Sequence, residues 1–162
     1  MIDVEYSELV EATVGNVLKS LGFKGPIEHE LQSGTAFELA YFKEDFGVSI
    51  EVDLLDDFFI AYIYEAGNEE RFRPTFRDDA GKIKKRYLNE ILRELGFISE
   101  RELKESNKRL RKLALDFRTN AKALCEEEAN SLKRWVPVLL PLRSSLGIKW
   151  GSGENGIKLR AE

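Results

Sequence analysis

The chain has 162 residues, of which 43% are hydrophobic and 33% are charged, and its net charge is −4. This length fits one compact domain with a buried core, and ten Phe residues exclude a disordered chain of high charge. The charge is divided by position, because residues 1–70 carry net −13 and residues 71–162 carry net +9. The single cysteine, Cys125, excludes an internal disulfide, and the first residues lack the pattern of a signal peptide, so we expect a cytoplasmic location.

The apolar stretches are too short for a membrane span. The longest, at residues 135–142, is interrupted by Pro137 and Pro141 and falls far below the roughly 20 residues that a bilayer requires. We therefore expect neither a transmembrane segment nor a membrane partner.

Residues 3–21 place apolar side chains at helical spacing, which predicts an amphipathic first helix. Gly22 should end it, because glycine adopts the left-handed C-cap conformation without steric penalty, and Phe23 can then fold back onto the last turn. The same ending recurs at residues 95–97.

From residue 36 to residue 65 the apolar period changes to two, which predicts strands with a buried face. Turns are expected at residues 44–47 and 55–57, where Gly and Asp tolerate the required backbone angles. The pattern indicates an antiparallel meander of three strands, or four if residues 27–31 add an edge strand.

Two helices should follow a polar loop at residues 67–78. The first is expected from near Asp79 to Leu95, and the second begins at a capping box formed by Ser99 and Glu102 and continues to Trp135. The predicted fold is therefore α+β, with residues 1–136 as a single domain and residues 137–162 as a C-terminal extension or small hairpin.

Acidic side chains gather in the predicted sheet region. We expect them to dock on a basic protein partner, because charge complementarity speeds association and selects the partner. A bacterial toxin-immunity protein is the concrete version, since nuclease active sites that bind phosphates attract carboxylates. This hypothesis predicts no catalytic residue, no metal and no cofactor, and its partner-binding residues are Glu38, Glu44, Asp45, Glu51, Asp53, Asp56 and Asp57.

Three alternatives remain open from the residues. Glu38, Glu51 and Asp53 could hold Mg²⁺ in a metal-dependent hydrolase or nuclease. The basic region at residues 71–122 could bind nucleic acid, but interleaved acidic residues and few neighbouring aromatic residues weigh against it. The long helix could also form a homodimer, with a seam made of Leu110, Leu113, Phe117, Ala121 and Leu124.

The first helix ending in Leu21-Gly22, followed by a meander through Phe37 to Tyr64, resembles the opening of chaperones of bacterial type III secretion. The resemblance covers roughly the first 65 residues and implies a small protein-binding α+β domain. The second half departs from it, because a long helix is predicted where further strands would be expected, so no family is assigned.

Overall fold

The structure is a computed structural model that describes residues 4–32, 35–55, 58–66 and 80–150. It confirms the predicted α+β class, and these ranges contain five strands where three or four were predicted. In chain order the elements are α1 (Val4–Val10), the π-helical turn η1 (Glu11–Gly15), α2 (Asn16–Ser20), β1 (Lys24–Gln32), β2 (Ala36–Lys43), β3 (Phe46–Asp53), β4 (Phe58–Glu65), β5 (Lys85–Tyr87), α3 (Leu88–Glu94), α4 (Glu100–Ala114), α5 (Phe117–Leu139) and the 3-10 turn η2 (Leu140–Ser145).

The first helix runs through α1, η1 and α2, and its apolar side packs into the core. Its π-helical turn brings Gly15 against β2, where a Cβ on this glycine would lie 2.6 Å from the hydroxyl oxygen of Tyr41. The predicted ending is confirmed, because Gly22 has a φ of +95° and the Phe23 amide donates a 3.0 Å hydrogen bond to the carbonyl of Leu18.

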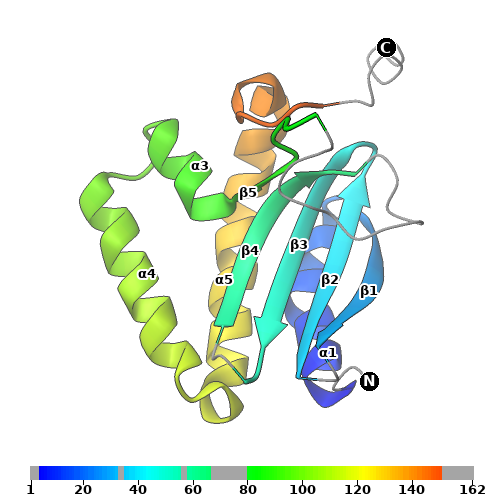
Figure 1. Ribbon diagram of the computed structural model, residues 1–162, viewed down its shortest axis with the longest axis vertical. Coiled ribbons are helices and arrows are strands. Elements are labelled where there is room, and N and C mark those ends of the chain that lie inside the picture. The colour runs from blue at the N-terminus through cyan, green and yellow to red at the C-terminus, as the bar shows by residue number, and fades with distance from the viewer. Residues whose placement is uncertain (1–3, 33–34, 56–57, 67–79, 151–162) are drawn as a thin grey trace.

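The five strands pair antiparallel in sequence order. The register places Leu39, Ile50 and Ala61 side by side on one face of the sheet. The first helix and α5 cover this face (Figure 1), and the main core lies between them and the sheet. Glu38 and Glu51 occupy opposing register positions on β2 and β3, and their side chains lie on the other face because side chains alternate along each strand.

Aromatic side chains join the helices to the sheet. The ring of Phe117 on α5 lies 5.2 Å from that of Tyr6 on α1 and 5.9 Å from that of Phe59 on β4. Cys125, on the same helix, is buried, and burial raises the pKa of its thiol to about 12. The thiol is therefore protonated at neutral pH and a poor nucleophile.

The helix predicted from near Asp79 to Leu95 is wrong over its first part. Lys85–Tyr87 form the short strand β5, and helix α3 begins only at Leu88. Pairing of Lys85 with Tyr64 on β4 outweighs the helical spacing of the sequence, because tertiary context overrides local propensity. The predicted helix ending at Gly96 is confirmed by its φ of +82°.

The helical spacing predicted from residue 99 to Trp135 is divided in the structure between two helices, α4 and α5. The chain breaks at Asp116, whose φ of −132° and ψ of 68° are not helical and whose carboxylate accepts a 3.4 Å hydrogen bond from the Thr119 amide. Figure 1 shows that the chain turns back after the break, so that α5 runs in the opposite direction to α4, and Arg109 and Glu127 form a 3.0 Å ion pair between the two helices. The predicted capping box is confirmed, because both of its hydrogen bonds form at the start of α4.

The helical seam that was proposed for self-association packs within this chain. Phe117, Ala121 and Leu124 are buried in the core, and Leu110 and Leu113 are half-buried against it.

Residues 137–150 continue the packed structure. Leu146 and Ile148 are buried in the main core, and the Trp150 ring stacks on Phe46 with centroids 5.6 Å apart. The second arm of the hairpin predicted near the C-terminus, at residues 156–159, lies outside the described residues. Across the described ranges, no helix has the length and apolar character that crossing a membrane would require.

Candidate functional site

The predicted acidic residues on the sheet face are linked to the basic half of the chain. Glu38 is fully buried, and its Oε2 accepts a 3.1 Å hydrogen bond from the ammonium of Lys85, which is itself buried on β5. Glu51 lies 3.9 Å from the same ammonium group. Glu38 and Glu51 therefore share one cation, Lys85, which comes from the basic half of the chain and balances one of their two negative charges.

Two tyrosines complete this cluster. The Lys85 ammonium lies 4.0 Å from the ring centroid of Tyr62, which stacks on Tyr87 at 5.1 Å. Burial, followed by the charge of Glu51, raises the pKa of Tyr62. The ion pair thus joins β5 to β2, and the two tyrosine contacts join β5 to β4.

The remaining predicted residues lie elsewhere. Asp53 is buried at the end of β3 and accepts a 3.0 Å hydrogen bond from the Leu55 amide. Glu44 and Asp45 form the β2–β3 turn, where Glu44 is exposed and Asp45 pairs with Arg143. Asp56 and Asp57 lie outside the described residues.

The metal hypothesis gains no support from this cluster. In the part of the chain that the structure describes, no three carboxylate, imidazole or thiolate side chains come close enough to hold a metal ion. The Lys85 ammonium lies where a cation between Glu38 and Glu51 would sit.

The basic region is only partly described, because residues 71–79 lie outside the described ranges. On α4, Arg101 forms an ion pair with Glu105 within the helix. Its other exposed cations are Lys104, Lys108, Arg109, Arg111 and Lys112.

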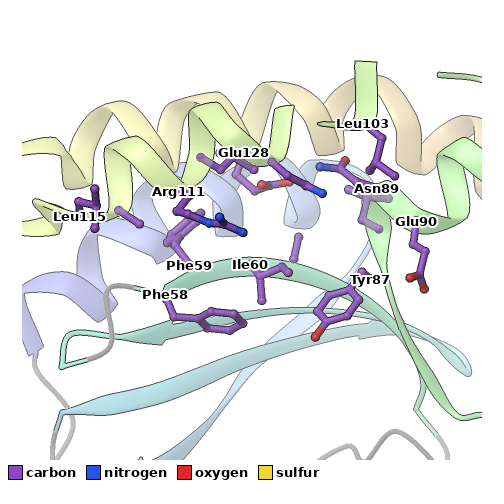
Figure 2. A pocket seen from close by; sticks show the side chains of 15 residues that line it. Phe58, Phe59, Ile60, Tyr87, Asn89, Glu90, Leu103, Arg111, Leu115 and Glu128 are labelled. Atoms are coloured by element: carbon purple, nitrogen blue, oxygen red, sulfur yellow. The ribbon is translucent and has the colours of Figure 1, made fainter. Parts of the chain in front are cut away.

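A pocket of about 570 Å³ opens between the edge of β4 and helices α3, α4 and α5. Figure 2 shows it in close view, with the helices above the sheet. Its walls are mostly apolar, and the lining residues are Phe58, Phe59, Ile60, Ala61, Tyr87, Leu88, Asn89, Glu90, Leu103, Asn107, Leu110, Arg111, Ala114, Leu115 and Glu128.

One wall of the pocket is a part of the β4 edge that pairs with no described strand. β4 has eight residues, but β5 pairs only with Tyr62–Tyr64 before the chain turns into α3. The Glu65 amide donates to the carbonyl of Lys84 on the β5 side, at 2.8 Å. Because backbone groups alternate in direction along a strand, the N–H and C=O groups of Phe59 and Ala61 point to the same side, beyond the reach of β5.

Glu128 supplies the pocket's buried charge. It projects from α5, is only 6% exposed, and receives no hydrogen bond or ion pair from any described residue. Burial, followed by the charge of Glu127, raises the pKa of Glu128 from 4.5 to about 7. A carboxyl group in this setting favours a cation or a hydrogen-bond donor that enters the pocket.

The other polar groups stand around this carboxyl group. Asn89 bridges α3 to α4 through a 3.3 Å hydrogen bond from its amide to the Ser106 hydroxyl. Arg111 is exposed on α4, and Glu90 lies on α3 near the pocket's end. When Glu128 is ionised, the charged residues that line the pocket sum to one negative charge.

Sequence reasoning missed this site. Glu128 lies in a run of three glutamates, which is typical of a solvated helix face. Its spacing from Leu124 and Leu132, four residues on either side, is the signal that could have placed it on the buried stripe. The unpaired edge of β4 could not be predicted, because β5 itself was predicted as helix.

Comparison of the chain with protein-family models, curated protein sequences and solved structures finds no match.

Proposed function

We propose that the chain is a non-enzymatic protein-binding module that receives an extended segment of a partner protein along the free edge of β4. The proposal is carried by the part of β4 beyond β5: backbone alternation turns the N–H and C=O groups of Phe59 and Ala61 to the edge that lines a pocket of about 570 Å³, and no described strand pairs with them there. An extended segment added at such an edge gains main-chain hydrogen bonds, and the pocket walls select its side chains.

The dimensions of the edge suit a short segment. Phe58–Ala61 is four residues long, or about 13 Å at the rise of a strand. Helix α4 forms the facing wall through Leu103, Leu110 and other residues, so an added strand would be covered on its helix side.

Binding rather than catalysis is supported by the residues at the pocket. Its lining residues include no Ser, Thr, Cys, His or Lys, which are the side chains that most nucleophilic mechanisms use. Glu90 on α3 and Glu128 on α5 line the pocket, and each carboxylate can bind a cation through electrostatic attraction alone.

A basic partner remains part of the proposal. Glu28, Glu30 and Glu44 are exposed on β1 and the β2–β3 turn, in a half of the chain that carries net −13. This field would attract a positively charged protein before it docks. A bacterial toxin bound by an immunity protein, or a secreted protein bound by its chaperone, is the kind of partner that we propose.

The test uses a short strand-forming probe, the acetylated pentapeptide Thr-Val-Lys-Val-Thr. Antiparallel pairing of its central residue with Ala61 would direct the central N–H toward β4 and the next Val N–H away from it. Methylating the central nitrogen should therefore abolish binding measured by NMR titration, and methylating the Val nitrogen should preserve it. Equal affinities of the two methylated peptides would contradict strand addition.

Two substitutions on α4 test where the peptide binds. Asn107→Trp places a large ring at the pocket from an exposed helical position, whereas Lys108→Trp adds the same ring at an exposed neighbour that does not line the pocket. We expect at least tenfold weaker peptide binding in the first variant and unchanged binding in the second. Equal binding by both variants would place the peptide elsewhere.

A further inference from the structure

We propose that the bound segment is recognised through a basic side chain that enters the pocket toward Glu128, between two apolar neighbours that pack on the other face of β4. This inference rests on the proposed function and adds the chemical identity of the segment. It predicts an apolar–basic–apolar pattern in the partner.

The charge argument starts from Glu128. Its carboxyl group is nine-tenths buried, lines the pocket and has no partner among the described residues. A buried carboxylate is costly without a cation, and a ligand that supplies one gains the interaction in a poorly hydrated site. Arg111 lies on the same pocket wall but forms no ion pair with Glu128.

The geometry of strand addition sets where the basic side chain would be. The side chains of Phe59 and Ala61 belong to the main core, on the helix side of the sheet, and Glu128 projects into the pocket from α5 on that same side. Directly paired residues of neighbouring strands share a face. A residue of the segment opposite Phe59 or Ala61 would therefore point toward α5.

The flanking residues of the segment would point to the other face. Figure 2 shows Phe58 and Tyr87 on the side of β4 away from the helices, with Ile60 between them. These three side chains are half-buried and leave apolar surface for two further side chains. Their aromatic rings favour branched or aromatic neighbours across the pair.

The raised pKa of Glu128 supports a basic side chain as its partner in the bound segment. Burial and the Glu127 charge raise the pKa of Glu128 to about 7. The other charged or titratable groups that line the pocket are Tyr87 on β5, Glu90 on α3 and Arg111 on α4. A cation seated against Glu128 should lower this pKa, and a neutral apolar group that excludes water should raise it further.

The deciding experiment compares Thr-Val-Lys-Val-Thr with the same peptide carrying norleucine at the centre, which removes the charge and keeps the alkyl stem. At pH 8 we expect the wild-type chain to bind the lysine peptide at least tenfold more tightly. In Glu128→Gln the preference should fall below twofold, with the affinity for the norleucine peptide retained. The matched control is Glu126→Gln, an exposed neighbour on α5 outside the pocket, and it should keep the tenfold preference.

Each outcome distinguishes the inference from the proposed function. Equal binding of both peptides by the wild-type chain would overturn the role of Glu128 and leave strand addition standing. Failure of both peptides to bind at millimolar concentration would overturn the proposed function as well. A second readout is the pKa of Glu128, measured by carbon-detected NMR. This pKa should fall on addition of the lysine peptide and rise on addition of the norleucine peptide. A shift in the same direction with both peptides would contradict the inference.

Discussion

Replacing Glu128 by glutamine should make the stability of the protein less dependent on pH. In the folded chain the pKa of Glu128 is raised from 4.5 to about 7 by burial and by Glu127, so the folded state holds this proton more tightly than the unfolded state. Stability that protonation provides is fully present below pH 4.5 and is lost as the pH rises through 7. Each pKa unit is worth about 1.4 kcal/mol, so the loss between these limits is about 3 kcal/mol.

Glutamine at position 128 keeps the shape of the protonated side chain and does not titrate. The free energy of unfolding of the variant minus that of the wild type should therefore be constant below pH 4.5 and about 3 kcal/mol larger by pH 8. Urea unfolding followed by circular dichroism at half-unit pH intervals measures this difference. Glu126→Gln is the exposed control and should give a flat difference. A flat difference for Glu128→Gln too would refute a buried, unpaired carboxyl group.

Three further predictions concern contacts that stabilise the fold outside the pocket. Gly15→Ala should destabilise the fold by about 1–2 kcal/mol, because its Cβ meets the hydroxyl of Tyr41, and the same change in a Tyr41→Phe background should be neutral or stabilising in thermal unfolding. Lys85→Met should destabilise the fold by about 3 kcal/mol, because it leaves Glu38 buried without its ammonium partner. A double-mutant cycle with Glu38→Gln, measured by urea unfolding, should show a coupling energy of at least 1 kcal/mol. Additive effects of the two substitutions would contradict a direct ion pair. Ser99→Ala should cost about 1 kcal/mol through loss of the capping box, measured by urea unfolding, and no loss would show that the box does not stabilise α4.

Local chemistry accounts for the parts of the fold that could be predicted. Gly22 and Gly96 end helices through backbone angles that other residues adopt poorly, and the hydrogen bonds that define these endings lie within a few residues. The period of two along β2, β3 and β4 likewise reflects one buried face, which the sequence displays directly.

The errors arise where distant residues decide the structure. Lys85 pairs with Glu38, 47 positions away, and this buried contact belongs to a strand that the helical spacing concealed. The break at Asp116 depends on a single cap and on the packing of α4 beside α5. In the sequence, Glu128 belongs to an acidic run that is typical of a solvated helix face. Its burial at the pocket depends on β4 and α4, which pack around it in the folded chain.

Amide hydrogen exchange on β4, measured with and without the pentapeptide, tests strand addition at this edge. In the free protein the Phe59 and Ala61 amides should exchange rapidly, because β5 pairs only with Tyr62–Tyr64. The Ile60 amide points toward β3 and serves as an internal reference that should change little. We expect at least tenfold slower exchange at Phe59 and Ala61 when the peptide saturates the protein, and unchanged exchange at both residues would contradict strand addition.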